Sequence, residues 1–189
     1  GRYDSVGVAL GVAETSQIPD RSSVKPGDVC IGLPSSGPHT NGYSLAREIT
    51  ALLDRNTLIG DQTLEEALLA PHLSYVNELL TAFAMQGTRI AAHITGGGIA
   101  QNLARVLPPT ATAIINTKAL PTLPIFDAIT NELRVTNDEM FRVFNMGVGA
   151  IFIVASETAH NLLAEFSGSV RIGEIVERRD VPVELAGLP

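Results

Sequence analysis

Short apolar runs alternate with helical patterns along this chain, and the runs have the length and the β-branched content of strands. Several runs are apolar at successive positions, which is typical of strands buried on both faces of a sheet. We therefore predict strands over residues 6–12, 29–33, 90–94, 111–115, 148–155 and 170–176.

The segments between these runs place apolar residues at the spacing of one helix face. Ser74 is the predicted N-cap of a helix that should end before Gly87, and Asn137 is the predicted N-cap of another. The apolar stripes are Leu45, Ile49, Leu52 and Leu53; Val76, Leu79, Leu80 and Phe83; and Ile99, Leu103, Val106 and Leu107, with further helices expected over 124–133, 138–144 and 157–166. This alternation favours an α/β domain (α+β in some schemes), with a mixed sheet and helices packed against it.

Three consecutive glycines join an apolar run to a helical pattern in the segment Ala92-His93-Ile94-Thr95-Gly96-Gly97-Gly98-Ile99-Ala100-Gln101-Asn102. Glycine permits positive φ and a close approach of a ligand, and the first amides of a helix have no partner within the helix. The turn over residues 95–98 is therefore a candidate phosphate site. A tight turn without a ligand is the alternative explanation of these glycines.

Two further segments carry glycine beside polar residues. The segment Gly32-Leu33-Pro34-Ser35-Ser36-Gly37-Pro38-His39-Thr40-Asn41-Gly42-Tyr43-Ser44 also lies between an apolar run and a helical pattern, so it could converge with the 95–98 turn on one ligand. The segment Asn145-Met146-Gly147-Val148-Gly149-Ala150 leads into a predicted strand. Its glycines either permit a bend and close strand packing or bring the backbone up to a ligand or a partner domain.

Histidine is the side chain in these turns that is best suited to proton transfer near neutral pH. His39 and His93 lie in the two turns, whereas the other two histidines lie in or near helices. Each of these two could donate to a phosphate or to a developing oxyanion, or shuttle a proton, and a purely structural role is the alternative. No histidine pair has i, i+4 spacing and neither turn contains Asp or Glu, so we predict no metal ligands.

Composition narrows the classes of partner and of reaction. The net charge of −7, with 13 scattered basic residues, argues against nucleic acid and anionic membranes as partners. Cys30 is the single cysteine and is expected to be a small buried residue, which suits a cytoplasmic protein. Ser35-Ser36-Gly37 lacks the Gly-x-Ser-x-Gly elbow of a serine hydrolase. Phosphoryl transfer needs cations near the phosphates, and the two lysines, Lys25 and Lys118, lie outside the glycine segments. We therefore expect this chain to supply only half of a phosphoryl-transfer site.

Three motifs together resemble the C-terminal half of the phosphoribosylformylglycinamidine cyclo-ligase family, also called the aminoimidazole ribonucleotide synthetase family. The motifs are Gly27-Asp28-Val29 leading to Gly32-Leu33-Pro34-Ser35-Ser36-Gly37-Pro38-His39-Thr40-Asn41-Gly42-Tyr43-Ser44-Leu45, then His93-Ile94-Thr95-Gly96-Gly97-Gly98, then Glu139-Met140-Phe141-Arg142-Val143-Phe144-Asn145-Met146-Gly147-Val148-Gly149. Their order and spacing match over nearly the whole chain.

The resemblance implies a purine-biosynthesis enzyme that uses ATP to close the imidazole ring of formylglycinamidine ribonucleotide and releases ADP and phosphate. It implies that the γ-phosphoryl group activates the formyl amide oxygen before the amidine nitrogen attacks. It also implies that residues 1–189 are a single C-terminal domain of a longer two-domain enzyme, a reading that the unusual start Gly1-Arg2-Tyr3 favours. The N-terminal domain, outside this chain, should supply most contacts to ATP and Mg, and the parent should be a cytoplasmic homodimer.

Carried over by position, the resemblance leads us to expect His39, Asn41 and His93 at the reacting centre. The residues expected to bind substrate and phosphate are Ser35, Ser36, Gly37, Thr40, Thr95, Gly96, Gly97, Gly98, Asn145, Gly147 and Gly149. The chain also departs from the family pattern: Leu73 replaces a common arginine, Asn77 a common lysine and Leu120 a common tryptophan. The first two departures remove possible phosphate contacts.

Related ATP-using families share this architecture, so they supply the alternative functions. They are formylglycinamidine ribonucleotide synthetase, thiamine-phosphate kinase, selenophosphate synthetase and a hydrogenase-maturation factor. The Ser-Ser-Gly-Pro-His and Phe-Asn-Met-Gly-Val-Gly segments favour the cyclo-ligase among them. A phosphate-binding domain that is inactive on its own is the alternative from another class.

Overall fold

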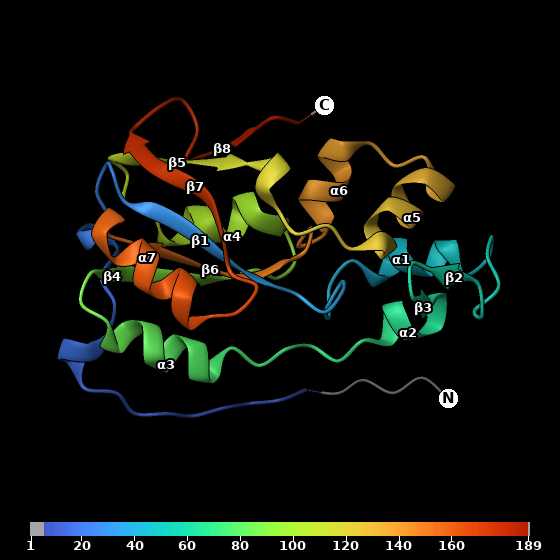
Figure 1. Ribbon diagram of the computed structural model, residues 1–189, viewed down its shortest axis with the longest axis horizontal. Coiled ribbons are helices and arrows are strands. Elements are labelled where there is room, and N and C mark those ends of the chain that lie inside the picture. The colour runs from blue at the N-terminus through green and yellow to red at the C-terminus, as the bar shows by residue number, and fades with distance from the viewer. Residues whose placement is uncertain (1–5, 189) are drawn as a thin grey trace.

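A six-stranded sheet lies at the centre of the computed structural model, which describes residues 6–188 (Figure 1). Its strand order is β4-β6-β1-β7-β5-β8. The strands are β1 Val29–Pro34, β4 Thr88–His93, β5 Ala111–Asn116, β6 Val148–Val154, β7 Val170–Glu177 and β8 Val183–Ala186. Every pairing is antiparallel except that of β5 with β8, which is parallel. The predicted mixed sheet is thus confirmed, with antiparallel pairings in the majority.

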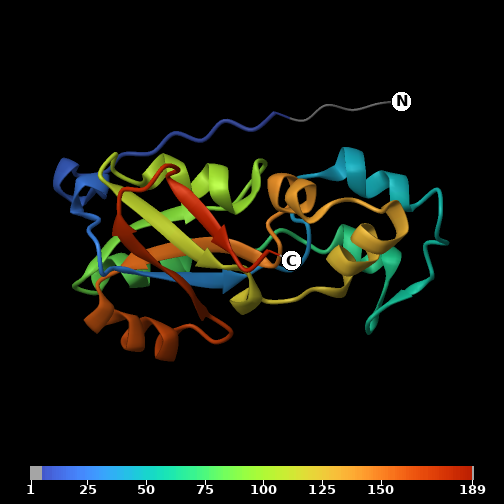
Figure 2. The same ribbon diagram turned by 90° about the horizontal axis from the view of Figure 1, so that it is seen from above.

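Helices cover both faces of this sheet and also build a separate lobe at one end (Figure 2). Helix α4 lies on one face, and α3 and α7 lie on the other. The lobe contains α1, α2, α5 and α6 with a small hairpin of β2 and β3. The bounds are η1 Thr15–Gln17, η2 Arg21–Ser23, α1 Tyr43–Ile49, β2 Leu58–Ile59, β3 Gln62–Thr63, α2 Leu64–Leu69, α3 Val76–Ala84, α4 Gly98–Val106, η3 Thr117–Ala119, α5 Pro124–Leu133, α6 Asn137–Val143 and α7 Ser156–Glu165.

The two faces of the sheet and the lobe each have a buried apolar cluster of their own. Ile99 and Leu103 of α4 pack on one face of the sheet, and Leu162 of α7 packs on the other. Strand β6 is buried at every position, as its uninterrupted apolar sequence predicts. Cys30 is fully buried in the α4-side core, and burial raises the pKa of its thiol to about 12, so the prediction of an inert buried cysteine is confirmed.

The strand predicted over residues 6–12 is wrong for this structure. The segment belongs to no strand, and Val6 and Leu10 are 89% and 96% exposed. A strand requires a neighbour that accepts its hydrogen bonds, and the pattern of a segment does not reveal whether the chain supplies one. The expectation drawn from Gly1-Arg2-Tyr3 lies outside the described residues.

Several helix details also differ from the prediction. Helix α3 has Tyr75 as its N-cap instead of Ser74, and α6 begins at Asn137 with Thr136 as its N-cap. Three of the four residues in the predicted stripe of α3 are exposed, because the helix packs on the sheet through Ala82 and, from the stripe, Leu79. Helix α2, the β2–β3 hairpin and β8 were not predicted, since each is too short to show a periodic pattern.

Candidate functional site

The topology of the sheet brings the three glycine-bearing segments to one edge. Strands β1 and β4 both pair antiparallel with β6, which lies between them, so their carboxyl ends lie beside the start of β6. In register, Pro34 lies opposite Val148 and His93 lies opposite Ala150. The segments that follow β1 and β4 and the segment that precedes β6 therefore converge, as the sequence predicts.

The 95–98 turn presents backbone rather than side chains. Gly97 and Gly98 have φ values of 96° and 65°, and a Cβ atom at Gly98 would overlap the carbonyl oxygen of Phe141 in α6. Within residues 6–188, the amides of Gly96 and Gly97 have no hydrogen-bond acceptor. They stand at the N-terminus of α4, where the helix dipole favours an anion.

One buried side chain fixes the shape of this turn. Asn102, which is 4% exposed, donates from Nδ2 to the carbonyl oxygens of Thr95, Gly96 and Gly98. Its Oδ1 accepts from the hydroxyl of Thr95 at 3.0 Å. The Thr95 hydroxyl is therefore used inside the turn, and the turn offers a ligand its amides.

The turn that follows β1, over residues 35–41, has the opposite character, because the groups without a partner are side-chain atoms of His39 and Asn41. His39 is 2% exposed with a φ of 57°, and its Nε2 accepts from the amide of Ser36 at 3.2 Å. The proton of the neutral ring is therefore on Nδ1, which is buried without a partner among the described residues. The Nδ2 of Asn41 is likewise buried and unpaired there, and its Oδ1 lies beside Gly96 of the other turn.

Asn145 ties the third segment to the 35–41 turn. Its Oδ1 accepts from the Ser35 hydroxyl at 3.1 Å and from the Gly147 amide at 2.9 Å, and its Nδ2 donates to the Gly37 carbonyl at 2.8 Å. Ser36 donates its hydroxyl to the carbonyl oxygen of Pro71. The polar groups of these residues are thus engaged within the chain. The ligand-binding roles predicted for them stay predictions.

His72, which sequence reasoning did not select, lies between the two predicted histidines. Its ring stacks on that of His39 at a centroid distance of 4.0 Å, and its Nε2 lies 3.0 Å from the Nε2 of His93. Gly149 leaves room for His39 and for Tyr75 beside it, because a Cβ atom at Gly149 would overlap the Tyr75 hydroxyl and crowd the His39 ring. Nothing in the local spacing of His72 signals the contact, which depends on the approach of the chain before α3 to the sheet edge.

Burial and mutual repulsion keep the predicted histidines neutral. Burial, followed by the nearby charges of His72 and His93, lowers the pKa of His39 to about 4. Burial and then His72 also lower the pKa of His93. Both rings are therefore uncharged near pH 7 and can act as neutral hydrogen-bond donors and acceptors.

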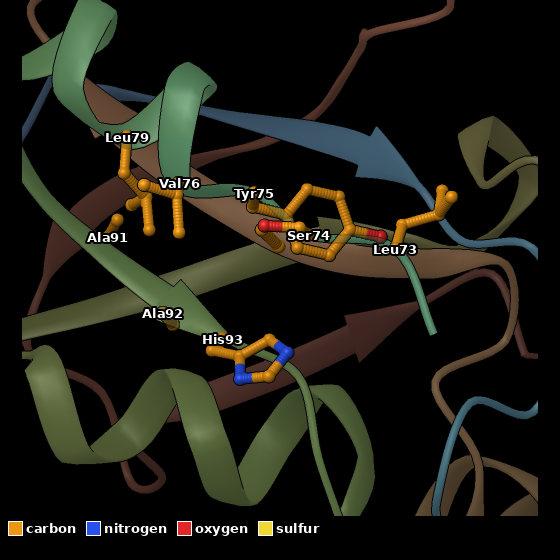
Figure 3. A pocket seen from close by; sticks show the side chains of 9 residues that line it. Leu73, Ser74, Tyr75, Val76, Leu79, Ala91, Ala92 and His93 are labelled. Carbon is orange, nitrogen blue, oxygen red and sulfur yellow. The ribbon is translucent and has the colours of Figure 1, made fainter. Parts of the chain in front are cut away.

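A cavity of about 370 Å³ opens beside this group, between the start of α3 and strand β4. Figure 3 shows His93 at the end of β4, with Tyr75 and Leu73 on the facing side. The lining residues are Leu73, Ser74, Tyr75, Val76, Leu79, Ala91, Ala92, His93 and Ala150. The predicted departure at Leu73 thus gives this cavity an apolar wall.

Two other classes of site were sought in the part of the chain that the structure describes. No group of three or more His, Cys, Asp or Glu side chains there is arranged to hold a metal ion. None of the helices there has the length and the apolar character needed to cross a membrane.

Curated proteins similar to this chain include two named phosphoribosylformylglycinamidine cyclo-ligase. Phosphoribosylformylglycinamidine cyclo-ligase from Cupriavidus pinatubonensis is 41% identical over 95% of this chain and 53% of its own length. The protein of that name from Myxococcus xanthus is 46% identical over 89% of this chain and 50% of its own length. The chain thus spans about half the length of the curated relatives it matches.

Solved structures share the fold at lower identity. Thiamine monophosphate kinase from Aquifex aeolicus has a TM-score of 0.60 at 14% identity, over 89% of this chain and 53% of its own. The hydrogenase maturation protein HypE from E. coli has a TM-score of 0.56 at 22% identity, over 87% of this chain and 48% of its own. Residues 25–185 match the family described as AIR synthase related protein, C-terminal domain. With most of its length inside that match, this chain belongs to the AIR synthase related protein family, as its C-terminal domain.

Proposed function

We propose that this chain is the C-terminal domain of an ATP-dependent cyclo-ligase that converts formylglycinamidine ribonucleotide to aminoimidazole ribonucleotide, with release of ADP and phosphate. The names of relatives at 41% and 46% identity support this substrate class. Because the chain spans about half of those relatives, the proposal concerns a two-domain parent in which this domain forms one wall of a cleft.

The observation that carries the proposal is that two turns, each with hydrogen-bond donors that lack an acceptor, converge at one edge of the sheet. The 95–98 turn offers amides without an acceptor within residues 6–188, and the 35–41 turn offers the unpaired Nδ1 of His39 and Nδ2 of Asn41. All are donors, and a phosphate or a developing oxyanion is the complementary acceptor. In the proposal, the amides hold a phosphate and the side chains line the reacting centre.

The reaction assigns different tasks to the two histidines. ATP transfers its γ-phosphoryl group to the formyl amide oxygen, the amidine nitrogen then attacks the activated carbon, and phosphate and one proton leave. The pKa of His39, lowered to about 4, makes this ring a poor base near neutral pH, so it acts as a neutral donor through Nδ1–H. His93 is the group that gives a proton to the departing phosphate.

ATP is the proposed nucleotide, and Mg is the proposed metal. Solved structures of this fold include a PurL from T. maritima complexed with AMPPCP and a HypE in complex with ATP. In our proposal the N-terminal domain supplies most contacts to both groups, since neither lysine of this chain lies in a glycine segment. The proposed parent is a cytoplasmic homodimer.

A kinase or maturation-factor function shares the fold but has weaker support. Thiamine monophosphate kinase and HypE are 14% and 22% identical to this chain, and similarity at that level shows the fold alone. The test is the turnover of the full-length parent with ATP and either formylglycinamidine ribonucleotide or thiamine monophosphate. We expect ADP release only with the ribonucleotide, and release only with thiamine monophosphate would overturn the assignment.

A substitution in the parent tests the phosphate site separately. We expect Gly97→Val to abolish turnover, because a branched side chain at a φ of 96° strains the turn and overlaps the side chain of Gln101. Gly27→Val is the matched control, since Gly27 has a φ of 92° and open space around it. Near-normal turnover of Gly97→Val with unchanged nucleotide binding would contradict the phosphate site.

A further inference from the structure

His72 is hydrogen-bonded at both ring nitrogens, unlike the two histidines that flank it. Its Nδ1 lies 3.3 Å from the hydroxyl oxygen of Thr40, and its Nε2 lies 3.0 Å from the Nε2 of His93. Both partners can accept a hydrogen bond: a hydroxyl oxygen has lone pairs, and so does the unprotonated nitrogen of a neutral imidazole. A protonated His72 therefore has an acceptor for each of its two N–H groups.

The same geometry limits the group to one added proton. If both His72 and His93 were protonated, two N–H groups would face each other across 3.0 Å, and the hydrogen bond would be replaced by repulsion. The stacked ring of His39, at a centroid distance of 4.0 Å, also disfavours a second positive charge.

We propose that His72 is a positioning residue of this site, which stores one proton between Thr40 and His93 and keeps His93 neutral with its Nε2 as an acceptor. In this arrangement the proton of the neutral His93 ring is on Nδ1. When His93 gives that proton to a departing phosphate oxygen, it receives one at Nε2 from His72, which becomes neutral. The transfer conserves protons and leaves the pair ready to be recharged from solvent.

The surroundings of His72 contain few competing charges. The titratable groups that face it are His39, from the turn after β1, and His93, from β4. Tyr75 lies 6.1 Å from the rings of both of these histidines, and burial with the nearby Glu78 raises the pKa of its hydroxyl, so it stays neutral. The stored proton is thus governed by the three imidazoles and the Thr40 hydroxyl.

The test is a titration of the imidazole nitrogens by NMR in this chain without any ligand. The catalytic meaning of the pair depends on the proposed function, but this measurement does not, so failure of one is distinguishable from failure of the other. In the unsubstituted chain we expect the midpoint of His93 to lie below that of an ordinary imidazole, because burial and the neighbouring His72 lower its pKa. In His72→Gln, His93 should titrate in one step with its midpoint moved to higher pH, because the neighbouring charge is gone. His160→Gln, on α7, is the control and should change neither midpoint.

A second pair of variants covers the case in which His72→Gln does not fold. Thr40 is exposed, so Thr40→Val should fold. It removes the acceptor of the His72 Nδ1–H, so the Nδ1 resonance of His72 should shift. Thr40→Ser restores the hydroxyl and should restore the position of that resonance. The proposal is overturned if His93 titrates at the same pH with and without His72, or if Thr40→Val and Thr40→Ser give the same His72 Nδ1 resonance.

Discussion

The two turns that meet at the sheet edge contribute in opposite ways. In the 95–98 turn Asn102 satisfies the Thr95 hydroxyl and three carbonyl oxygens, and the backbone amides of Gly96 and Gly97 have no acceptor within residues 6–188. In the 35–41 turn the unpaired groups are side-chain atoms of His39 and Asn41. The first turn is a rigid cradle of backbone, and the second supplies chemically active side chains.

The difference between the turns predicts which substitutions should reduce the stability of the fold and which should affect mainly the functional site. A buried donor without a partner costs free energy, so the 35–41 turn holds His39 and Asn41 at the expense of stability. The 95–98 turn is held by a buried hydrogen-bond network, so its substitutions should damage the fold as well as the site. The predictions that follow run from the largest expected effect on the free energy of unfolding to the smallest.

Gly98→Ala should cause the largest loss, about 4 kcal/mol of unfolding free energy, because backbone strain and steric overlap act together. Gly98 has a φ of 65°, and a methyl group there would overlap the Phe141 carbonyl oxygen. Urea unfolding measures the loss. Gly27→Ala is the control, since its φ of 92° lies in open space, and it should lose only about 1 kcal/mol. Equal losses would mean that the 95–98 turn is not tightly held.

Asn102→Ala should cost about 3 kcal/mol of unfolding free energy, because it leaves three carbonyl oxygens, that of Gly98 in a buried hydrogen bond, and the Thr95 hydroxyl without their partner. The same urea experiment measures it. Asn131→Ala, at an exposed position of α5, is the matched control and should change stability by less than about 0.5 kcal/mol. A loss for Asn102→Ala as small as that of the control would remove the structural basis of the cradle.

Acidification should weaken the fold through the second turn. The pKa of His39 falls from 6.5 to about 4 on folding, so between these values the unfolded chain binds more protons. The contribution of the neutral His39 ring to the free energy of unfolding is therefore fully present above pH 6.5. On the order of 2 kcal/mol of this free energy is lost as the pH falls toward 4. Urea unfolding across this range measures the slope. His39→Asn should flatten the slope, and an unchanged slope would show that His39 does not cause it.

Ser36→Ala should have the smallest effect, about 0.5 to 1 kcal/mol, because its hydroxyl makes one hydrogen bond to Pro71 at an exposed site. Thermal unfolding is the measurement, with Ser22→Ala, at an exposed position of η2, as the control. A loss as large as that of Asn102→Ala would show that the 35–41 turn is as tightly built as the 95–98 turn and would erase the contrast.

The sequence predicted the long elements and the convergence of the glycine segments, because periodicity and glycine position are local signals. Helix α5 has the predicted bounds, and β6 lies within a residue of its prediction. The failure over residues 6–12 has a physical cause: an apolar alternation specifies a strand's faces but not its partner. In the same way, His72 escaped prediction because its role depends on contacts with His39 and His93, which are distant in sequence.

The most direct test of the central claim, that the 95–98 turn binds phosphate through its backbone, is an amide NMR titration of this chain with inorganic phosphate. We predict that the amide resonances of Gly96 and Gly97 move together with the Nδ1 resonance of His39, and that Gly97→Val abolishes these shifts while Gly27→Val retains them. Resonances of Gly96 and Gly97 that stay in place throughout the titration would contradict the claim.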